Sequence, residues 1–187
     1  MNITLPNGDV REYEQGTTGM EIAKSISEGL ARVAVGIFVN GEKYDLSRKI
    51  ENDSSIELVT FDDPRGKEIY WHSSAHLMAE ALQTLYPGVK FGIGPAIETG
   101  FYYDVDIPGD TKISSDDLPA IEKKMLELAS KNEEYTRKEI SWQEAVDYFT
   151  KVGDEYKLEL LDGLKDQEIT FYQQGDFVDL CRGSLVF

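Results

Sequence analysis

Residues 71–82 constrain this chain most strongly, because they place its only two histidines, His72 and His76, four positions apart in a segment with a helical pattern. Positions i and i+4 lie one turn apart on the same face of an α-helix, so both imidazoles would point into one space. We therefore expect a packed helix whose histidines face another part of the chain. Apolar side chains repeat with helical period about 100° away around the axis: Trp71, Ala75, Met78, Leu82 and Leu85.

The only cysteine, Cys181, lies near the other end of the sequence. A single cysteine cannot form an internal disulfide, which fits a reducing compartment. By default a lone cysteine is a small buried hydrophobic residue, and a His-x-x-x-His pair alone is weak evidence for a site. Folding that brings Cys181 to both histidines would nevertheless create one.

The size and composition suit a soluble globular protein. A length of 187 residues accommodates two small domains, and we expect two of unequal size. Apolar residues make up 41% and charged residues 29% of the chain, and no apolar run reaches membrane-spanning length. Because no signal peptide is visible either, we expect a cytoplasmic protein with no membrane partner.

The charge distribution argues against a general nucleic-acid-binding surface. The formal net charge is −16, and residues 1–62 carry 6 basic and 11 acidic side chains, while the remainder carries 13 and 24. Binding a long phosphate backbone requires a basic excess. Any nucleic acid would therefore be held locally, or by a part of the protein outside this sequence.

The first 61 residues predict a small β-grasp domain. Asn7-Gly8 and Asn40-Gly41 are dipeptides suited to tight hairpin turns, and Thr18 and Glu21 form a capping-box pattern that opens one short helix. The expected order is two strands, a helix and two or three strands, at residues 3–5, 10–13, 18–26, 33–39, 43–46 and 55–60.

Residues 61–67 lack periodicity and contain both proline and glycine, which predicts a linker. We accordingly expect one domain at residues 1–61 and a second at residues 62–187.

The second part predicts an α+β domain with an antiparallel sheet. The histidine helix should end at Pro87-Gly88. A hairpin is expected from residues 89–93 and 97–105, with Gly94-Pro95 as its turn. Later elements are an edge strand, two helices and a final strand pair, at residues 135–140, 141–149, 155–161, 168–172 and 177–181.

A further helix is expected after residues 114–117, whose Ser-Ser-Asp-Asp sequence is typical of an N-terminal cap. Its apolar positions have helical spacing, so we expect them to be buried: Leu118, Ile121, Met125 and Leu128.

The histidines do not match a His-Glu-x-x-His metalloprotease, because Ser73 stands where that motif has its glutamate. A zinc site made by His72, His76 and Cys181 is an alternative, since these are three of the four ligands that a structural zinc site uses. With three protein ligands, one coordination position would stay open.

Three motifs raise the significance of these residues. Residues 93–104 read Ile-Gly-Pro-Ala-Ile-Glu-Thr-Gly-Phe-Tyr-Tyr-Asp, residues 156–161 read Tyr-Lys-Leu-Glu-Leu-Leu, and residues 179–183 read Asp-Leu-Cys-Arg-Gly. Together with His-Ser-Ser-Ala-His they make the chain resemble the N-terminal region of bacterial-type threonyl-tRNA synthetases. The resemblance covers essentially the whole chain, and it implies a β-grasp TGS domain followed by an editing domain.

The resemblance also implies a function. Enzymes of this family charge tRNA(Thr), and their editing domain hydrolyses the ester of mischarged Ser-tRNA(Thr). It assigns His72 to activating or positioning water, His76 to completing the pocket and Lys157 to stabilising the oxyanion or the substrate carbonyl. Asp179 and Cys181 would bind the seryl group. ATP and the catalytic zinc belong to a catalytic body that this sequence lacks, so we expect no cofactor and no aminoacylation here.

The chain departs from the family pattern at one end. The family's Pro-His after Cys-Arg-Gly is Ser184-Leu185 here, which implies an editing domain truncated at its C-terminus, with residues 184–187 either native or appended. We expect this piece to be a monomer, although the family's complete enzyme is expected to form a homodimer.

Other mechanisms and functions stay open at this point. Cys181 could attack the ester directly, but nothing in the sequence supplies a third orienting group, so activated water is favoured. The chain could also be a non-catalytic RNA- or ligand-binding module, or a zinc-dependent hydrolase.

Overall fold

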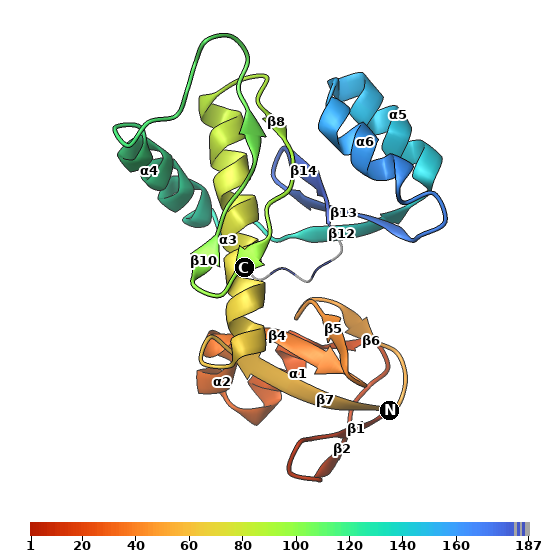
Figure 1. Cartoon of the computed structure of the whole chain (residues 1–187). Helices are drawn as coiled ribbons and strands as arrows, with labels where there is room; N and C mark the ends of the chain where they lie inside the picture. The colour runs from red at the N-terminus through yellow and green to blue at the C-terminus, as the bar shows by residue number, and fades with distance from the viewer. Residues whose placement is uncertain (182, 184, 186–187) are drawn as a thin grey trace. The chain divides into compact units, whose positions relative to one another are not determined.

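The computed structural model describes residues 1–181, 183 and 185 (Figure 1). It divides into two compact units, and the division falls between Trp71 and His72, inside helix α3 (Pro64–Leu85). Gly183 and Leu185 group with the first unit. None of the described helices combines the length and the hydropathy needed to cross a membrane.

The first unit is built on a mixed five-stranded sheet in the order β2-β1-β7-β4-β5. The β1–β7 pair is parallel and the other pairs are antiparallel. A separate pair joins β3 and β6. The strands are β1 (Asn2–Thr4), β2 (Val10–Glu12), β3 (Thr17–Thr18), β4 (Ala34–Val39), β5 (Glu42–Tyr44), β6 (Lys49–Ile50) and β7 (Ser54–Thr60).

Helix α1 (Gly19–Ile26) packs on this sheet through Ile22, which joins Ile3, Ile37 and Ile56 in one core. The predicted capping box is present, since the Thr18 hydroxyl accepts from the Glu21 backbone and Glu21 bonds back to Thr18. Sheet and helix together confirm the α+β class of this unit.

The prediction of a single helix here was wrong, because α2 (Glu28–Val33) follows at once. Ser27 caps this helix by accepting from the backbone N–H of Leu30 at 3.0 Å. Such a short helix contributes too few positions for a periodic signal, so Val33 was assigned to the following strand.

The predicted linker was also wrong for residues 64–67, which form the first turn of α3. Proline suits the first position of a helix, where its missing N–H would have no intrahelical partner. Asp63 assists by accepting from the Arg65 backbone N–H at 2.8 Å. The turn is then fixed by packing, since Ile69 is buried against Val35 and Val59.

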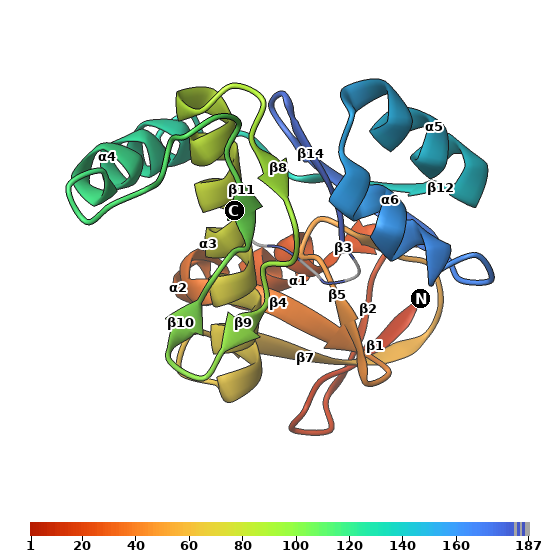
Figure 2. The same ribbon diagram turned by 45° about the horizontal axis from the view of Figure 1, so that its top comes forward.

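The second unit contains the rest of α3, a three-stranded antiparallel sheet in the order β12-β13-β14, and two small ladders, β8–β11 and β9–β10. Figures 1 and 2 show α4 beside α3, and α5 beside α6. The elements are β8 (Lys90–Phe91), β9 (Ala96–Ile97), β10 (Gly100–Phe101), β11 (Val105–Asp106), α4 (Leu118–Ala129), β12 (Thr136–Ile140), α5 (Trp142–Val152), α6 (Glu155–Asp162), β13 (Ile169–Gln174) and β14 (Phe177–Leu180).

Alternation along β13 and β14 places two cores of the second unit on opposite sides of the sheet. Ile169 and Phe171 face α5 and α6, where they pack with Phe149 and Leu161. On the other side of the sheet, Phe177 of β14 joins residues of α3, β8 and α4 in a second core. The predicted strand pair and the Ser141 capping box are both present.

The expected hairpin exists, but its turn was placed wrongly. Residues 90–91 pair with residues 105–106, and residues 96–97 pair with residues 100–101, so the chain reverses at Glu98 and Thr99. Gly94 instead allows the backbone to pass close to the Tyr103 ring, because a Cβ there would lie 2.4 Å from Cδ2 of Tyr103.

Helix α4 also differs from its expected form. Leu118 is 55% exposed, whereas Ile121 and Leu128 are buried and Met125 is partly buried. Asp117 does not cap the helix with its side chain, because that carboxylate accepts from Ser114 at the backbone N–H and at the hydroxyl.

Candidate active site

Strand β14 delivers one half of the candidate site. Side chains alternate between the two faces of a strand, so Phe177, Asp179 and Cys181 project to the same side. Cys181 follows the strand directly and is still held to β13, since its backbone N–H donates to the Thr170 carbonyl at 3.1 Å. The Thr170 hydroxyl donates in return to the Cys181 carbonyl. The thiol is thereby fixed by the sheet.

Helix α3 supplies the other half. Sγ of Cys181 lies 3.4 Å from Nε2 of His72, and the ring centroids of His72 and His76 are 5.0 Å apart. One possible ligand atom from each of the three side chains lies within 4.8 Å of the others. The structure therefore brings the distant cysteine to the two histidines, whose shared helix face was predicted from their spacing.

His76 is the more deeply buried histidine, with 2% of its surface exposed. Phe177 and Tyr135 contact its ring edge-on, at centroid distances of 6.0 and 6.3 Å. Burial is the main cause that lowers the pKa of His76 to about 4. The negative charge of Asp179 opposes this shift, while His72 and Lys157 lower the pKa further. The imidazole is therefore neutral at neutral pH. Within the described part of the chain, its buried Nδ1 has no hydrogen-bond partner.

Lys157 and Asp179 form a buried ion pair, with 2.6 Å between Nζ and Oδ1 and 3% exposure for each residue. Nζ also donates to the Gly92 carbonyl at 3.0 Å, and the Tyr103 hydroxyl donates to Oδ2 of Asp179. Burial, followed by the negative charge of Asp179, raises the pKa of Tyr103 well above its ordinary value. Tyr103 is therefore a permanent donor to this carboxylate.

These contacts overturn the default expectation for both charged residues. A lysine on an acidic helix and an aspartate at a strand end would ordinarily be solvated. Lys157 instead points inward from α6. Asp154 caps this helix, and its side chain accepts from the Lys157 backbone N–H. A buried charge must be paired, and here each is paired with the other.

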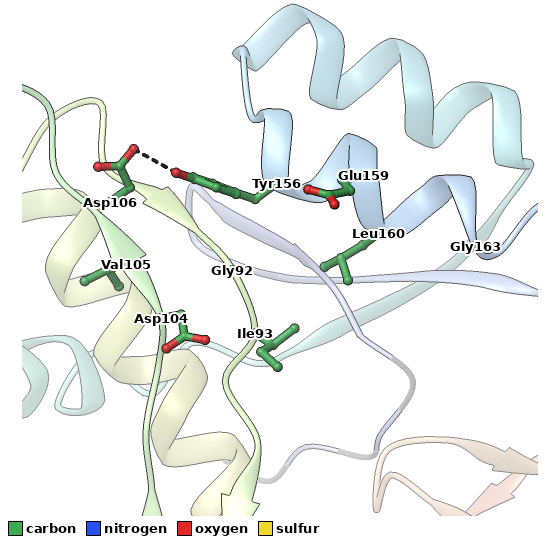
Figure 3. Close-up of a pocket in the computed structure, with 9 residues that line it drawn as sticks. All are labelled: Gly92, Ile93, Asp104, Val105, Asp106, Tyr156, Glu159, Leu160 and Gly163. Carbon is green, nitrogen blue, oxygen red and sulfur yellow. Dashed lines mark hydrogen bonds between the residues drawn. The ribbon is translucent and has the colours of Figure 1, made fainter.

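A cavity of about 680 Å³ adjoins this ion pair, because Gly92 lies in its wall. Figure 3 shows Tyr156, Glu159 and Leu160 on α6 across from Ile93 and from Asp104 and Asp106. The Tyr156 hydroxyl donates to Asp106 at 3.2 Å. The volume of this cavity falls in the range of small-molecule sites.

A second hollow of about 250 Å³ reaches Cys181 itself. Leu160 lines both hollows, so the two are neighbours.

Sequence reasoning missed Tyr103, Thr170 and the Gly92 carbonyl as members of this site. Tyr103 belonged to a recognised motif, but three successive aromatic residues do not reveal which of them faces a carboxylate. Thr170 and Gly92 act through contacts that only the paired strands create, so no local signal marked them.

The cluster can be tested as a zinc site. Zinc bound at about 2.0–2.3 Å in tetrahedral geometry requires ligand atoms about 3.3–3.8 Å apart. The 3.4 Å contact between His72 and Cys181 meets this requirement, and the set of three would need only a small contraction. A neutral His76 with an unpartnered ring nitrogen also suits a metal ligand.

Leu185 stands where the family resemblance predicts the histidine of Pro-His. Its backbone N–H donates to the buried Asp45 at 2.8 Å, and both residues belong to the first unit. Ser184, Val186 and Phe187 lie outside the described residues, so the expectation about the origin of residues 184–187 is untested.

Comparison with known proteins identifies the chain's relatives. Residues 1–60 match the model of the TGS domain family. The chain is 62% identical to a threonine–tRNA ligase from Cytophaga hutchinsonii, 56% identical to one from Parabacteroides distasonis and 55% identical to one from Bacteroides fragilis. Each match covers 98% of this chain and 28% of the relative, so the chain spans under a third of their length.

A TGS domain followed by a second α+β unit is what this chain shares with proteins named as aminoacyl-tRNA ligases. Over 98% of its length it is similar to the N-terminal region of the threonine–tRNA ligases.

Proposed function

We propose that the second unit is an editing site that hydrolyses the ester bond of Ser-tRNA(Thr). The observation that supports this most directly is the cluster of His72, His76 and Cys181 next to the buried Lys157–Asp179 pair, with a cavity of about 680 Å³ beside it. The five residues come from three separate segments of the chain, and they supply a proton acceptor, a cation and polar contacts.

The need for such an activity follows from magnitudes. A pocket that selects threonine over serine gains only about 1–3 kcal/mol from one methyl group, or roughly 10- to 200-fold. Translation requires higher accuracy, and a second site that removes serine would supply it. The relatives' name, threonine–tRNA ligase, makes tRNA(Thr) the substrate carrier.

The reaction adds water across an ester. In our proposal, His72 accepts a proton from water as the oxygen attacks the seryl carbonyl, and that proton leaves with the ribose oxygen when the ester bond breaks. His76, with its pKa of about 4, is a poor proton acceptor at neutral pH and would orient the water or the substrate. We assign Cys181 to the pocket and not to direct attack on the ester, because His72, the residue that would activate its thiol, activates water in this proposal.

Lys157 has the right bonding capacity for an oxyanion. An ammonium group carries three donors, and the contacts to Asp179 and Gly92 use two of them. The third would stabilise the negative charge that develops on the carbonyl oxygen. Asp179 would both hold this lysine and accept from the seryl group.

The cavity suits the end of an aminoacylated tRNA better than its phosphate backbone. Ile93, Val105 and Leu160 offer apolar surface to a nucleobase, and the nearby carboxylates would attract an ammonium and accept from ribose hydroxyls. The same carboxylates repel phosphate, so the body of the tRNA would be held elsewhere. Aminoacylation, with its ATP, zinc and homodimer, would belong to the longer proteins, and a cytoplasmic monomer is our proposal for this piece.

A deacylation assay with Ser-tRNA(Thr) and Thr-tRNA(Thr) tests the proposal. We expect serine-selective hydrolysis that His72→Ala abolishes and that Gln83→Ala, an exposed position on the same helix, leaves intact. Lys157→Met should also abolish it, provided that circular dichroism confirms folding. Equal hydrolysis of both esters would contradict the proposed selectivity.

A zinc-dependent hydrolase is a second candidate, favoured by the three ligand atoms within 4.8 Å and by the unpartnered Nδ1 of His76 in the described structure. Bound zinc would lower the pKa of a water molecule and so supply hydroxide. Elemental analysis of the purified chain decides the matter: stoichiometric zinc that His76→Ala removes favours this candidate.

A non-catalytic RNA- or ligand-binding module is the third candidate, supported by the TGS match over residues 1–60. NMR shift mapping with tRNA(Thr) separates it from the first. Perturbations confined to the first unit, together with no hydrolysis, would favour it.

A further inference from the structure

Two carboxylates lie close to one glycine, outside the site described so far. Glu80 lies on α3 one turn after His76, and Glu133 lies in the segment between α4 and β12. A Cβ on Gly175, in the turn between β13 and β14, would lie 2.5 Å from Oε2 of Glu133 and 3.1 Å from Oε1 of Glu80. The distance between the two carboxylate oxygens therefore cannot exceed the sum of these two distances.

The surroundings give Glu80 little compensation for a negative charge. Its exposure is 7%, and within the described residues no hydrogen-bond donor contacts its carboxylate. The charged groups around it are Glu133, Asp176 and one cation, Lys131, whose Nζ lies 3.9 Å from Glu133. Tyr135 is the remaining titratable neighbour, and its pKa is raised mainly by burial, so it stays neutral.

Most of these surroundings raise the pKa of Glu80. Burial raises it first, then the negative charge of Glu133, and the pKa reaches about 7. Asp176 acts in the same direction, and Lys131 opposes it. Two carboxylates that share a site cannot both ionise easily, so one retains its proton at pH values where an isolated glutamate would have lost it.

We propose that Glu80 and Glu133 hold one proton between them, and that this carboxyl–carboxylate contact fixes the β13–β14 turn on helix α3. The turn leads directly into the strand that carries Asp179 and Cys181, while Glu80 is one helical turn from His76. Glu80 is thus a positioning residue for the cluster. Its effect on catalysis rests on the proposed deacylase activity.

Rising pH should release this contact. When the shared proton is lost, two negative charges face each other across Gly175, and the turn moves away from α3. The Cys181–His72 contact and the placement of Asp179 are then loosened.

The first test needs no substrate. NMR of the full chain with ¹³C-labelled glutamate follows the side-chain carboxyl of Glu80, which we expect to titrate with a midpoint near 7. Hydrogen exchange at the Gly175 and Asp176 amides should rise with pH by more than the tenfold per unit that base catalysis gives. An ordinary midpoint for Glu80 would overturn the proposal.

Variants separate charge from structure. Glu80→Gln resembles the protonated side chain, so it should fold and lose the extra rise in exchange above pH 7. Glu133→Gln should bring the midpoint of Glu80 down towards its usual range. Glu122→Gln removes the same charge from an exposed site and should leave the pH response unchanged. A Glu80→Gln chain that keeps the wild-type pH response would contradict the shared proton.

The catalytic consequence has its own readout. Wild-type deacylation should fall several-fold between pH 7 and pH 8.5, and Glu80→Gln should flatten this fall without changing the rate at pH 6.5. Identical pH profiles would refute the positioning role. Titration of Glu80 near pH 7 without any hydrolysis of Ser-tRNA(Thr) would refute the deacylase and support the proton-sharing pair.

Discussion

Nζ of Lys157 on α6 and Oδ1 of Asp179 on β14 lie 2.6 Å apart, and both residues are almost completely buried. Strand β13 separates these two elements in the sequence. A buried pair of this kind is costly to break, because removing one member leaves an uncompensated charge in the interior. The pair thereby links the placement of α6 to that of β14.

Asp179→Asn should destabilise the chain by about 3–5 kcal/mol, because it leaves the Lys157 ammonium buried without a counter-charge. The double variant Lys157→Met/Asp179→Leu should recover most of this loss by replacing both charges with apolar side chains. Chemical denaturation monitored by circular dichroism measures the effect. Asp162→Asn, which breaks an exposed pair with Lys165, is the control and should cost about 0–1 kcal/mol. A small effect of Asp179→Asn would mean that water reaches the pair.

Lower pH should destabilise the fold through His76. Its pKa is about 4 in the folded chain and near 6.5 when unfolded, so the unfolded chain binds the extra proton. The stabilisation that His76 provides is complete above pH 6.5 and is lost as the pH falls towards 4, by at most about 3 kcal/mol. Urea unfolding of the wild type and of His76→Gln at pH 7 and pH 4.5 measures this. The variant should lose less stability on acidification, and equal losses would contradict the burial of a neutral imidazole.

Gly94→Ala should disturb the site without altering any of its polar residues. The new methyl group would lie 2.4 Å from the Tyr103 ring, so the ring must move away and weaken its hydrogen bond to Asp179. We expect a loss of about 1–3 kcal/mol, typical of overpacking. Gly163→Ala is the matched control, because its added Cβ meets nothing closer than 3.6 Å. Similar stability for both variants in thermal unfolding would show that the hairpin of residues 90–106 accommodates the methyl group without strain.

Ser141→Ala should destabilise α5 by about 1 kcal/mol, because the Ser141 hydroxyl accepts from the Glu144 backbone and its loss removes one half of the capping box. Denaturant titration measures the change. Ser115→Ala, at an exposed position outside any described helix or strand, should have no comparable effect.

Local rules predicted the elements whose signals are local. The Thr18 and Ser141 capping boxes, the Asn40-Gly41 turn and the final strand pair follow from propensity and spacing alone, and all are present. The errors arose where tertiary packing determines the secondary structure. Pro64 and Gly66 suggested a linker, but the burial of Ile69 against the sheet makes this stretch helical.

The candidate site was only partly accessible to sequence reasoning. Helical spacing pairs His72 with His76, so these two were expected to share a face, whereas Asp179 and Cys181 were assigned to the site only by the family resemblance. Nothing in the spacing joins the two pairs, and the buried Lys157–Asp179 contact contradicts the usual solvation of such residues. Their proximity depends on how β14 lies against α3, which only the folded structure provides.

The two-residue turn at Gly175 and Asp176 sets which side of β14 each residue occupies, since Gln174 pairs with Phe177 on either side of it. Inserting one residue there would rotate the strand's pattern by half a period, turning Val178 and Leu180 towards the histidines and sending Asp179 and the thiol to the side of α5. The length of a surface loop is therefore as much a requirement of this chemistry as the identity of any side chain in it.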